Sequence, residues 1–265
     1  MTNLPATDEA YNKSIPQETS SLDTVINLQK AAALSPFGGV VLIAHFFGCN
    51  LIHLQRPEPD DREHDIQGEF WKRHRSMDNT LLNTSLNLPL HLRLPAGVRD
   101  PNTVFLNMNI HTSTICLHQA AIFKAEKNDM PTSLIEQSNT RCLLAASEIT
   151  SIMRLINHLD ISGMNPFMAF CIYIAARVFV HFLKRSPHEQ EVVVSLRFLL
   201  NAMNALKRRQ PITESFLTQL NLDMQASGLG ALLKNPETSS SLLDGMVSIL
   251  SLPPITPFCS RPDGY

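Results

Sequence analysis

The feature that most constrains the fold is a run from Asn165 to Leu183 that is apolar almost throughout. A helix that is apolar on nearly all faces must be buried, either in a membrane or at the centre of a protein. A membrane span needs about 20 apolar residues, and this run is interrupted by Arg177 and again by His181. We therefore expect it to form the central helix of a soluble bundle.

A second apolar run extends from Gly38 to Leu54 and leads to the same expectation. It is short for a membrane span and contains His45 and Asn50. We predict a second buried helix here, and no contact of the chain with a membrane.

The rest of the chain carries helical signals rather than strand signals. Asp100 and Pro101 are a helix start, with Asp as N-cap and Pro at the first helical position. Ser133 and Ser186 each begin a capping box. The segment between Leu88 and Pro95 is flanked by prolines, which favours an extended connector. The predicted helices beyond the two apolar runs cover residues 69–82, 100–127, 133–156, 186–206, 213–222 and 242–250.

These signals indicate an all-α protein with one multi-helix, bundle-like domain. Only ten of the 265 residues are glycine, which disfavours a Rossmann fold, a TIM barrel or a β-sandwich. We expect three parts: a flexible N-terminal segment at 1–34, a helical domain at 35–250 and a Pro-rich tail at 251–265. The N- and C-terminal tails are expected to be irregular.

Composition narrows the class of function. Charged residues make up 17 % of the chain, below the roughly 25 % of an average domain, and the net charge is −2. The chain therefore lacks the basic excess of an autonomous nucleic-acid binder. Its five cysteines are odd in number and widely spaced, which favours reduced thiols in an intracellular protein. No secretory signal is recognisable at the N-terminus.

Motifs for catalysis, metals and nucleotides are absent from the sequence. There is no Gly-x-Ser-x-Gly, no His-Glu-x-x-His and no Gly-x4-Gly-Lys-Ser/Thr. Cys116 and Cys142, the closest cysteines, are 26 positions apart, so no zinc-type pair exists. We expect no cofactor, no metal and no enzymatic activity, and favour a binding or regulatory module.

Three polar side chains interrupt the apolar stripes and are the candidates for effector or partner contacts: His111, His118 and Arg177. The two histidines lie on one helical face, but seven residues separate them by about 10 Å, too far for ligands of one ion. Partly buried core histidines are the alternative interpretation. Arg177 could equally pair with a carboxylate such as Glu148.

Several segments, in this order and spacing, resemble the fungal-specific transcription factor domain, the middle homology region of zinc-cluster transcription regulators. The resemblance covers roughly residues 35–225. Its most specific part is Ala-Ala-Arg-Val-Phe at 175–179. The resembling segments are 50–61, 70–75, 90–95, 109–119, 164–179 and 199–208.

The resemblance implies an all-α regulatory domain of a nuclear protein, often dimeric, that controls metabolic or secondary-metabolite genes. Family members carry a six-cysteine zinc cluster that binds DNA, and no such cysteine spacing occurs here. The chain is therefore expected to begin part-way through the regulatory domain, without zinc, and to reach DNA only indirectly or through a missing N-terminal segment. The alternative is a free-standing helical scaffold or inhibitory partner of full-length regulators.

Overall fold

The structure is a computed structural model, and it describes residues 3–28, 34–55, 62–159 and 164–229. Within these ranges the chain is helical, with a single isolated β-bridge between Asn3 and Ser21. The all-α prediction is confirmed. The elements are α1 (Asp8–Asn12), α2 (Leu22–Leu28), α3 (Pro36–Gln55), α4 (Glu69–Asn87), the 3₁₀ helix η1 (Leu90–Leu92), α5 (Pro101–Lys127), α6 (Thr132–Leu155), α7 (Met168–Arg185), α8 (Gln190–Leu206) and α9 (Ile212–Ala226).

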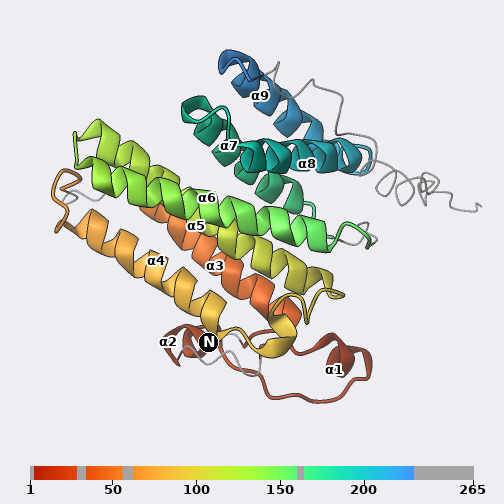
Figure 1. Ribbon diagram of the computed structural model, residues 1–265. Helices are drawn as coiled ribbons and strands as arrows, with labels where there is room; N and C mark the ends of the chain where they lie inside the picture. The colour runs from red at the N-terminus through yellow and green to blue at the C-terminus, as the bar shows by residue number, and fades with distance from the viewer. Residues whose placement is uncertain (1–2, 29–33, 56–61, 160–163, 230–265) are drawn as a thin grey trace, which may run out of the picture.

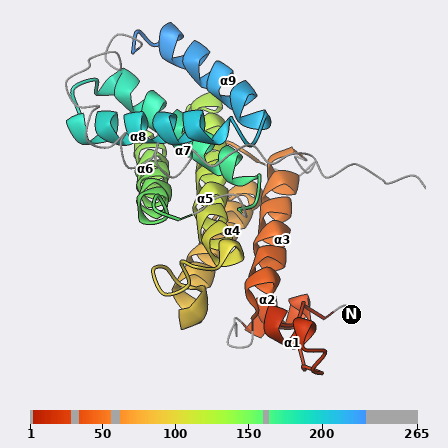
Figure 2. The same cartoon turned by 90° about the vertical axis from the view of Figure 1, so that its right-hand side faces the viewer.

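The long helices form two groups. Helices α3, α4, α5 and α6 run side by side, and α7, α8 and α9 pack over one side of them (Figure 1). The view turned by 90° shows α5 between α3 and α6 (Figure 2). The short helices α1 and α2 lie at one end of α3.

Helix α5 is the centre of the described structure, because it contributes to all three apolar clusters. Met108 and Ile115 pack with α6, α7, α8 and α9. Leu106 packs with α2, α3 and α4, and Ala121 packs with Phe70 and Trp71 of α4. The prediction that the apolar run at 165–183 is the central helix is thus corrected: α7 is well buried, but α5 occupies the middle.

The reason is that α5 buries polar side chains as well as apolar ones. Thr112 and Ser113 are fully buried, although both residue types suggest a solvent-facing position. The hydroxyl of Thr112 donates to the carbonyl oxygen of Met108 at 2.9 Å, and Asn50 of α3 donates to the carbonyl oxygen of Ser113 at 3.1 Å. The bond from Thr112 offsets the cost of burying that hydroxyl, so apolar content alone underestimates how deeply such a helix lies.

Helix α3 is less buried than expected. Phe37, Leu51 and Ile52 are 48 %, 38 % and 58 % exposed. The stretch Pro36–Leu54 is long and apolar enough to cross a membrane, and 33 % of an 18-residue part of it is buried inside the protein. Length and composition alone do not indicate a transmembrane protein, because the core helix of a soluble protein can be equally long and apolar. The inner face of α3 lies so close to α5 that a methyl group on Gly39 would lie 2.8 Å from a methyl carbon of Leu106.

Helix boundaries confirm one start signal and correct two. The carboxylate of Asp100 accepts a hydrogen bond from the Thr103 amide at 2.9 Å and caps α5. Neither predicted capping box forms: α6 begins at Thr132, and Ser186 is the residue that ends α7, since α8 begins only at Gln190. The residues before the two helices, Pro131 and Glu189, make no side-chain cap.

The N-terminal segment is more structured than the expected flexible stretch. It contains α1 and α2, and Leu4 and Val25 are buried against α3 and α4. Ser35 donates a hydrogen bond to the carbonyl oxygen of Pro5 at 2.8 Å. The connector at 88–95 is not a strand but includes η1. The predicted helix at 242–250 and the tail at 251–265 lie outside the described residues.

Candidate functional site

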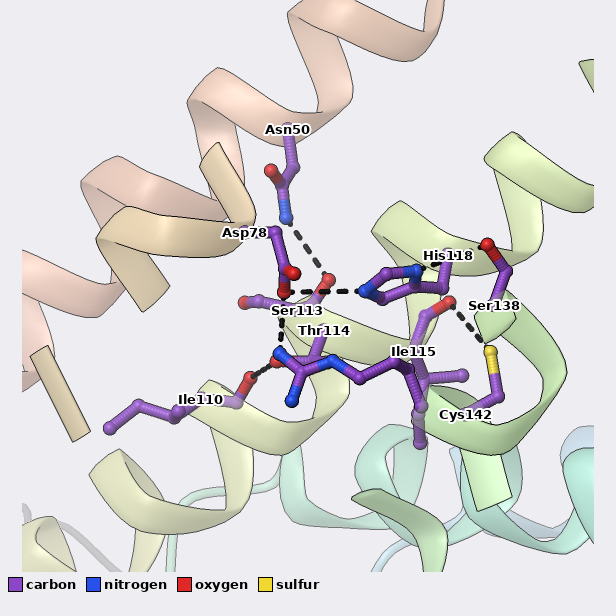
Figure 3. A network of polar contacts seen from close by, with 10 residues as sticks. Asn50, Asp78, Ile110, Ser113, Thr114, Ile115, His118, Ser138 and Cys142 are labelled. Carbon is purple, nitrogen blue, oxygen red and sulfur yellow. Dashed lines mark hydrogen bonds and ion pairs between the residues drawn. The ribbon is translucent and has the colours of Figure 1, made fainter. Parts of the chain in front are cut away.

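His118 lies inside the protein in a polar network that joins α4, α5 and α6 (Figure 3). Its Nε2 is 3.2 Å from Oδ1 of Asp78 in α4, and its Nδ1 is 3.4 Å from the hydroxyl of Ser138 in α6. Arg141 of α6 donates to the same Oδ1 of Asp78 at 2.6 Å. The His74 ring meets the His118 ring edge to face, with centroids 5.1 Å apart.

The network is electrostatically organised around Asp78. Burial alone would raise the pKa of Asp78, but the contacts from His118 and Arg141 outweigh it and lower that pKa to about 2. His74 has the opposite surroundings: burial, followed by the nearby charge of His118, lowers its pKa to about 3. Asp78 is therefore ionised and His74 is neutral near pH 7, which suits a buried network that holds α4, α5 and α6 together.

His111, the second candidate, lies about two turns earlier on α5 and is half-buried. Burial, then the charge of Arg141, lowers its pKa to about 4, so it is neutral near pH 7. The charge of Arg141 thus acts on His111 as well, but only His118 is fully inside the protein. Their role as effector contacts stays a prediction.

Arg177, the third candidate, lies on another side of the molecule. Its partner is Asp223 of α9, with Nε and Oδ2 3.5 Å apart, and not Glu148. The guanidinium also stands over the ring of Tyr173, 5.7 Å from its centroid. The structure therefore does not bring the three predicted residues together: His118 belongs to the Asp78 network, His111 makes no contact with Asp78 there, and Arg177 belongs to a separate surface.

That surface is an open groove of about 630 Å³ between α5, α6 and the second half of α7. Arg177, His181 and Arg185, which are spaced four residues apart on α7, line one wall. Glu126 of α5 lies 3.9 Å from Arg185. The complete lining is Gln119, Ile122, Phe123, Glu126, Glu136, Asn139, Thr140, Cys142, Leu143, Arg177, Val178, His181, Phe182, Arg185 and Ser186.

Sequence reasoning did not identify most of these residues. Asp78 and Arg141 lie 63 positions apart, and only the packing of α4 on α5 and α6 makes them neighbours. Half-buried Glu63 pairs with Lys124 of α5, 61 positions away, and the hydrogen bond from Lys124 lowers the pKa of Glu63. The four-residue spacing of basic side chains on α7 was the one usable signal for the groove.

Chemistry beyond binding is not evident in the described part of the chain. No group of three or more His, Cys, Asp or Glu there could hold a metal ion. Cys116, Cys142 and Cys171 have thiols whose pKa burial raises to about 11, 12 and 12. A thiol with so high a pKa is a poor nucleophile near pH 7.

Comparison with known proteins adds an independent finding. No family model matches the chain, and no solved structure matches it. The chain is similar to the pigment biosynthesis transcriptional activator pigB of Monascus ruber, with 25 % identity over 238 residues. The match covers 89 % of this chain and 42 % of that protein, so the chain spans less than half the length of the curated relative.

The match extends over the groove and the Asp78 network, since it leaves only about a tenth of the chain uncovered. A relative that is a transcriptional activator argues against an enzyme. The similarity supports, in general terms, a transcription regulator of fungal type.

Proposed function

We propose that this chain is the helical regulatory domain of a fungal transcription regulator that acts in the nucleus on metabolic or secondary-metabolite genes. The observation that carries the proposal is the length of the match to the pigment activator, 89 % of the chain. Similarity on that scale includes most of the helical framework rather than one short motif. The Asp78 network fixes the arrangement of the helices and the open groove offers a binding surface, which together suit a binding domain. Among the described residues no catalytic constellation favours another function.

In this proposal the domain regulates by binding proteins or small effectors rather than by reading DNA. Its net charge of −2 gives it no electrostatic attraction to phosphates. Its cysteines lack the paired spacing of a zinc cluster. DNA contact would come from a separate segment or from a partner protein.

A tethering experiment tests this function. The chain is fused to the DNA-binding domain of an unrelated regulator, and expression of a reporter gene is compared with that DNA-binding domain alone. We expect a change in expression that disappears when Leu196, a fully buried core residue, is replaced by Asp. Reporter expression equal to that of the DNA-binding domain alone would contradict the proposal.

A gel-shift titration with the unfused chain tests the indirect contact with DNA. We expect no sequence-specific band at 150 mM salt. A specific band that weakens steeply as salt rises would show that the chain reads DNA itself, and the expectation of indirect contact would then be wrong.

A second candidate function is a helical scaffold or inhibitory partner of full-length regulators, and the outer face of α3 favours it. Between Pro36 and Gln55 the chain has no Asp, Glu, Lys or Arg, although Phe37, Leu51 and Ile52 are exposed. These positions share one helical face with Gly48, where an added methyl group would meet nothing within 4 Å. An uncharged face of this kind suits a partner helix.

Co-expression distinguishes the two functions. An inhibitory partner would leave a tethered reporter unchanged but lower the activity of a full-length regulator expressed beside it. The replacement Ile52→Asp should abolish that inhibition, whereas Leu222→Asp, at a similarly exposed position of α9, should not. Equal loss of inhibition in the Ile52→Asp and Leu222→Asp variants would mean that the α3 face is not the docking surface.

A further inference from the structure

The groove between α5, α6 and α7 has two electrostatically different ends. Arg177 and Arg185 are eight residues apart on α7, which corresponds to about 12 Å along the helix. Arg185 is 70 % exposed and has an acid, Glu126, within the groove lining. The other lining acid, Glu136, lies in the first turns of α6, close to the α5–α6 turn. Both acids are therefore at the Arg185 end.

Arg177 has the capacity to bind an anion. Its carboxylate partner, Asp223, belongs to α9 and is not part of the groove lining. That contact is long, at 3.5 Å, and the Nε of Arg177 makes no hydrogen bond within the described residues. A guanidinium carries five N–H donors in a planar fork. With 36 % of its side chain exposed, Arg177 can present its remaining donors to a ligand in the groove.

Between the two ends, apolar side chains of all three helices line the groove beside His181. Ile122 of α5, Leu143 of α6, and Val178 and Phe182 of α7 line it together. These side chains are buried or half-buried, so they form a fixed wall rather than loose surface contacts. A ligand that lies along them gains apolar burial while its anionic group stays beside Arg177.

We propose that this groove binds an apolar small molecule that carries one carboxylate. The carboxylate pairs with Arg177, and the apolar body lies along α5, α6 and α7 toward Arg185. Glu126 and Glu136 repel the carboxylate from the other end, so the ligand has one orientation. The volume of about 630 Å³ is within the range of small-molecule sites. As an effector site, the groove deepens the proposed regulatory function and rests on it for its biological meaning.

The test is a fluorescence titration of the purified full chain with cis-parinaric acid and, separately, with its methyl ester. The ester has the same apolar body and no charge. We expect the acid to bind at least tenfold more tightly than the ester, because a charge-assisted guanidinium–carboxylate pair is lost in the ester. Equal affinities, or no binding of either probe, would overturn the proposal.

Two variants locate the anion. Arg177→Gln should reduce the affinity for the acid at least tenfold and leave that for the ester unchanged. Arg185→Gln, at the other end of the groove beside Glu126, should weaken binding of the acid less than Arg177→Gln does. If Arg177→Gln and Arg185→Gln weaken the acid equally, the anion does not sit at Arg177 and the proposal is wrong.

A third variant keeps the test valid if Arg177→Gln perturbs folding. Leu143→Trp fills the groove from the α6 side, and we expect it to weaken acid and ester alike, with circular dichroism unchanged. Full binding to this variant would show that the probes bind elsewhere. These titrations use no reporter gene, so loss of probe binding and failure of the tethering experiment are separate outcomes.

Discussion

The buried imidazole of His74 makes the stability of the domain depend on pH, and the size of the effect follows from the structure. Its ordinary pKa of about 6.5 falls to about 3 in the folded protein, chiefly because it is buried. In the unfolded chain His74 takes up a proton below pH 6.5, whereas in the folded domain it stays neutral down to about pH 3. Its contribution to stability is thus fully present above pH 6.5 and is lost as the pH falls.

Between pH 7.5 and pH 5.0 the free energy of unfolding falls by about 2 kcal/mol because of His74. Only the interval of about 1.5 pH units below the ordinary pKa of about 6.5 counts, and each unit costs about 1.36 kcal/mol. His111, with its pKa lowered to about 4, adds a similar loss of about 2 kcal/mol. The carboxylate of Asp78 contributes little in this range, because its stabilisation is lost only as the pH falls below about 4 toward 2. A domain of this kind is stable by only about 5–15 kcal/mol, so the change is measurable.

The assay is urea denaturation at pH 7.5 and pH 5.0, followed by circular dichroism. We expect His74→Gln to reduce the difference in unfolding free energy between the two pH values by about 2 kcal/mol, even if the variant is less stable at both. Ile149→Val is the control: it removes a methyl group from a fully buried side chain and costs about 1 kcal/mol at both pH values without titrating. A His74→Gln variant with an unchanged pH difference would refute the reasoning.

Three further predictions concern single positions. Gly48→Ala should raise the free energy of unfolding by up to about 1 kcal/mol, since the new methyl group meets nothing within 4 Å and alanine favours a helix. Gly97→Ala should lower the free energy of unfolding, because its methyl group would lie 2.3 Å from a backbone carbonyl oxygen. Thermal unfolding should show opposite signs, and equal signs would contradict the packing described. Asp78→Asn should cost about 1–3 kcal/mol in urea denaturation at pH 7, because the arginine and histidine that it contacts lose their carboxylate; an unchanged midpoint would mean that the network does not stabilise the fold. Cys171, with its pKa raised to about 12 by burial, should resist iodoacetamide in the folded chain while half-buried Cys49 is alkylated; mass spectrometry that finds Cys171 modified without denaturant would contradict its burial.

Local patterns predicted the number and position of the long helices well. The Asp100–Pro101 start is where α5 begins, and the apolar runs at 38–54 and 165–183 correspond to α3 and α7. These features depend on spacing along one helix, which a sequence contains directly. The predicted capping boxes failed because a Ser-x-x-Glu pattern states only that a cap can form: α6 starts directly after Pro131, and α8 starts directly after Glu189.

The candidate residues show the limit of such patterns. His118 and Arg177 were picked for the same reason, a polar residue within an apolar stripe, yet one is enclosed by Asp78 and Ser138 and the other borders an open groove. A stripe shows which side of a helix faces inward but not what faces it there. Contacts between segments far apart in the chain decide that.

The amino-acid sequence by itself determined the all-α class, the start of α5 and the resemblance to a fungal regulatory domain. Only the tertiary structure decided that α5 rather than α7 is central, that Asp78 holds His118 and Arg141, and that α5, α6 and α7 leave a groove beside Arg177. The physical reason is that periodicity reports the burial of one face of one helix. Which helices share a core, and where they fail to fill the space between them, depends on side-chain shapes that meet only after the chain has folded.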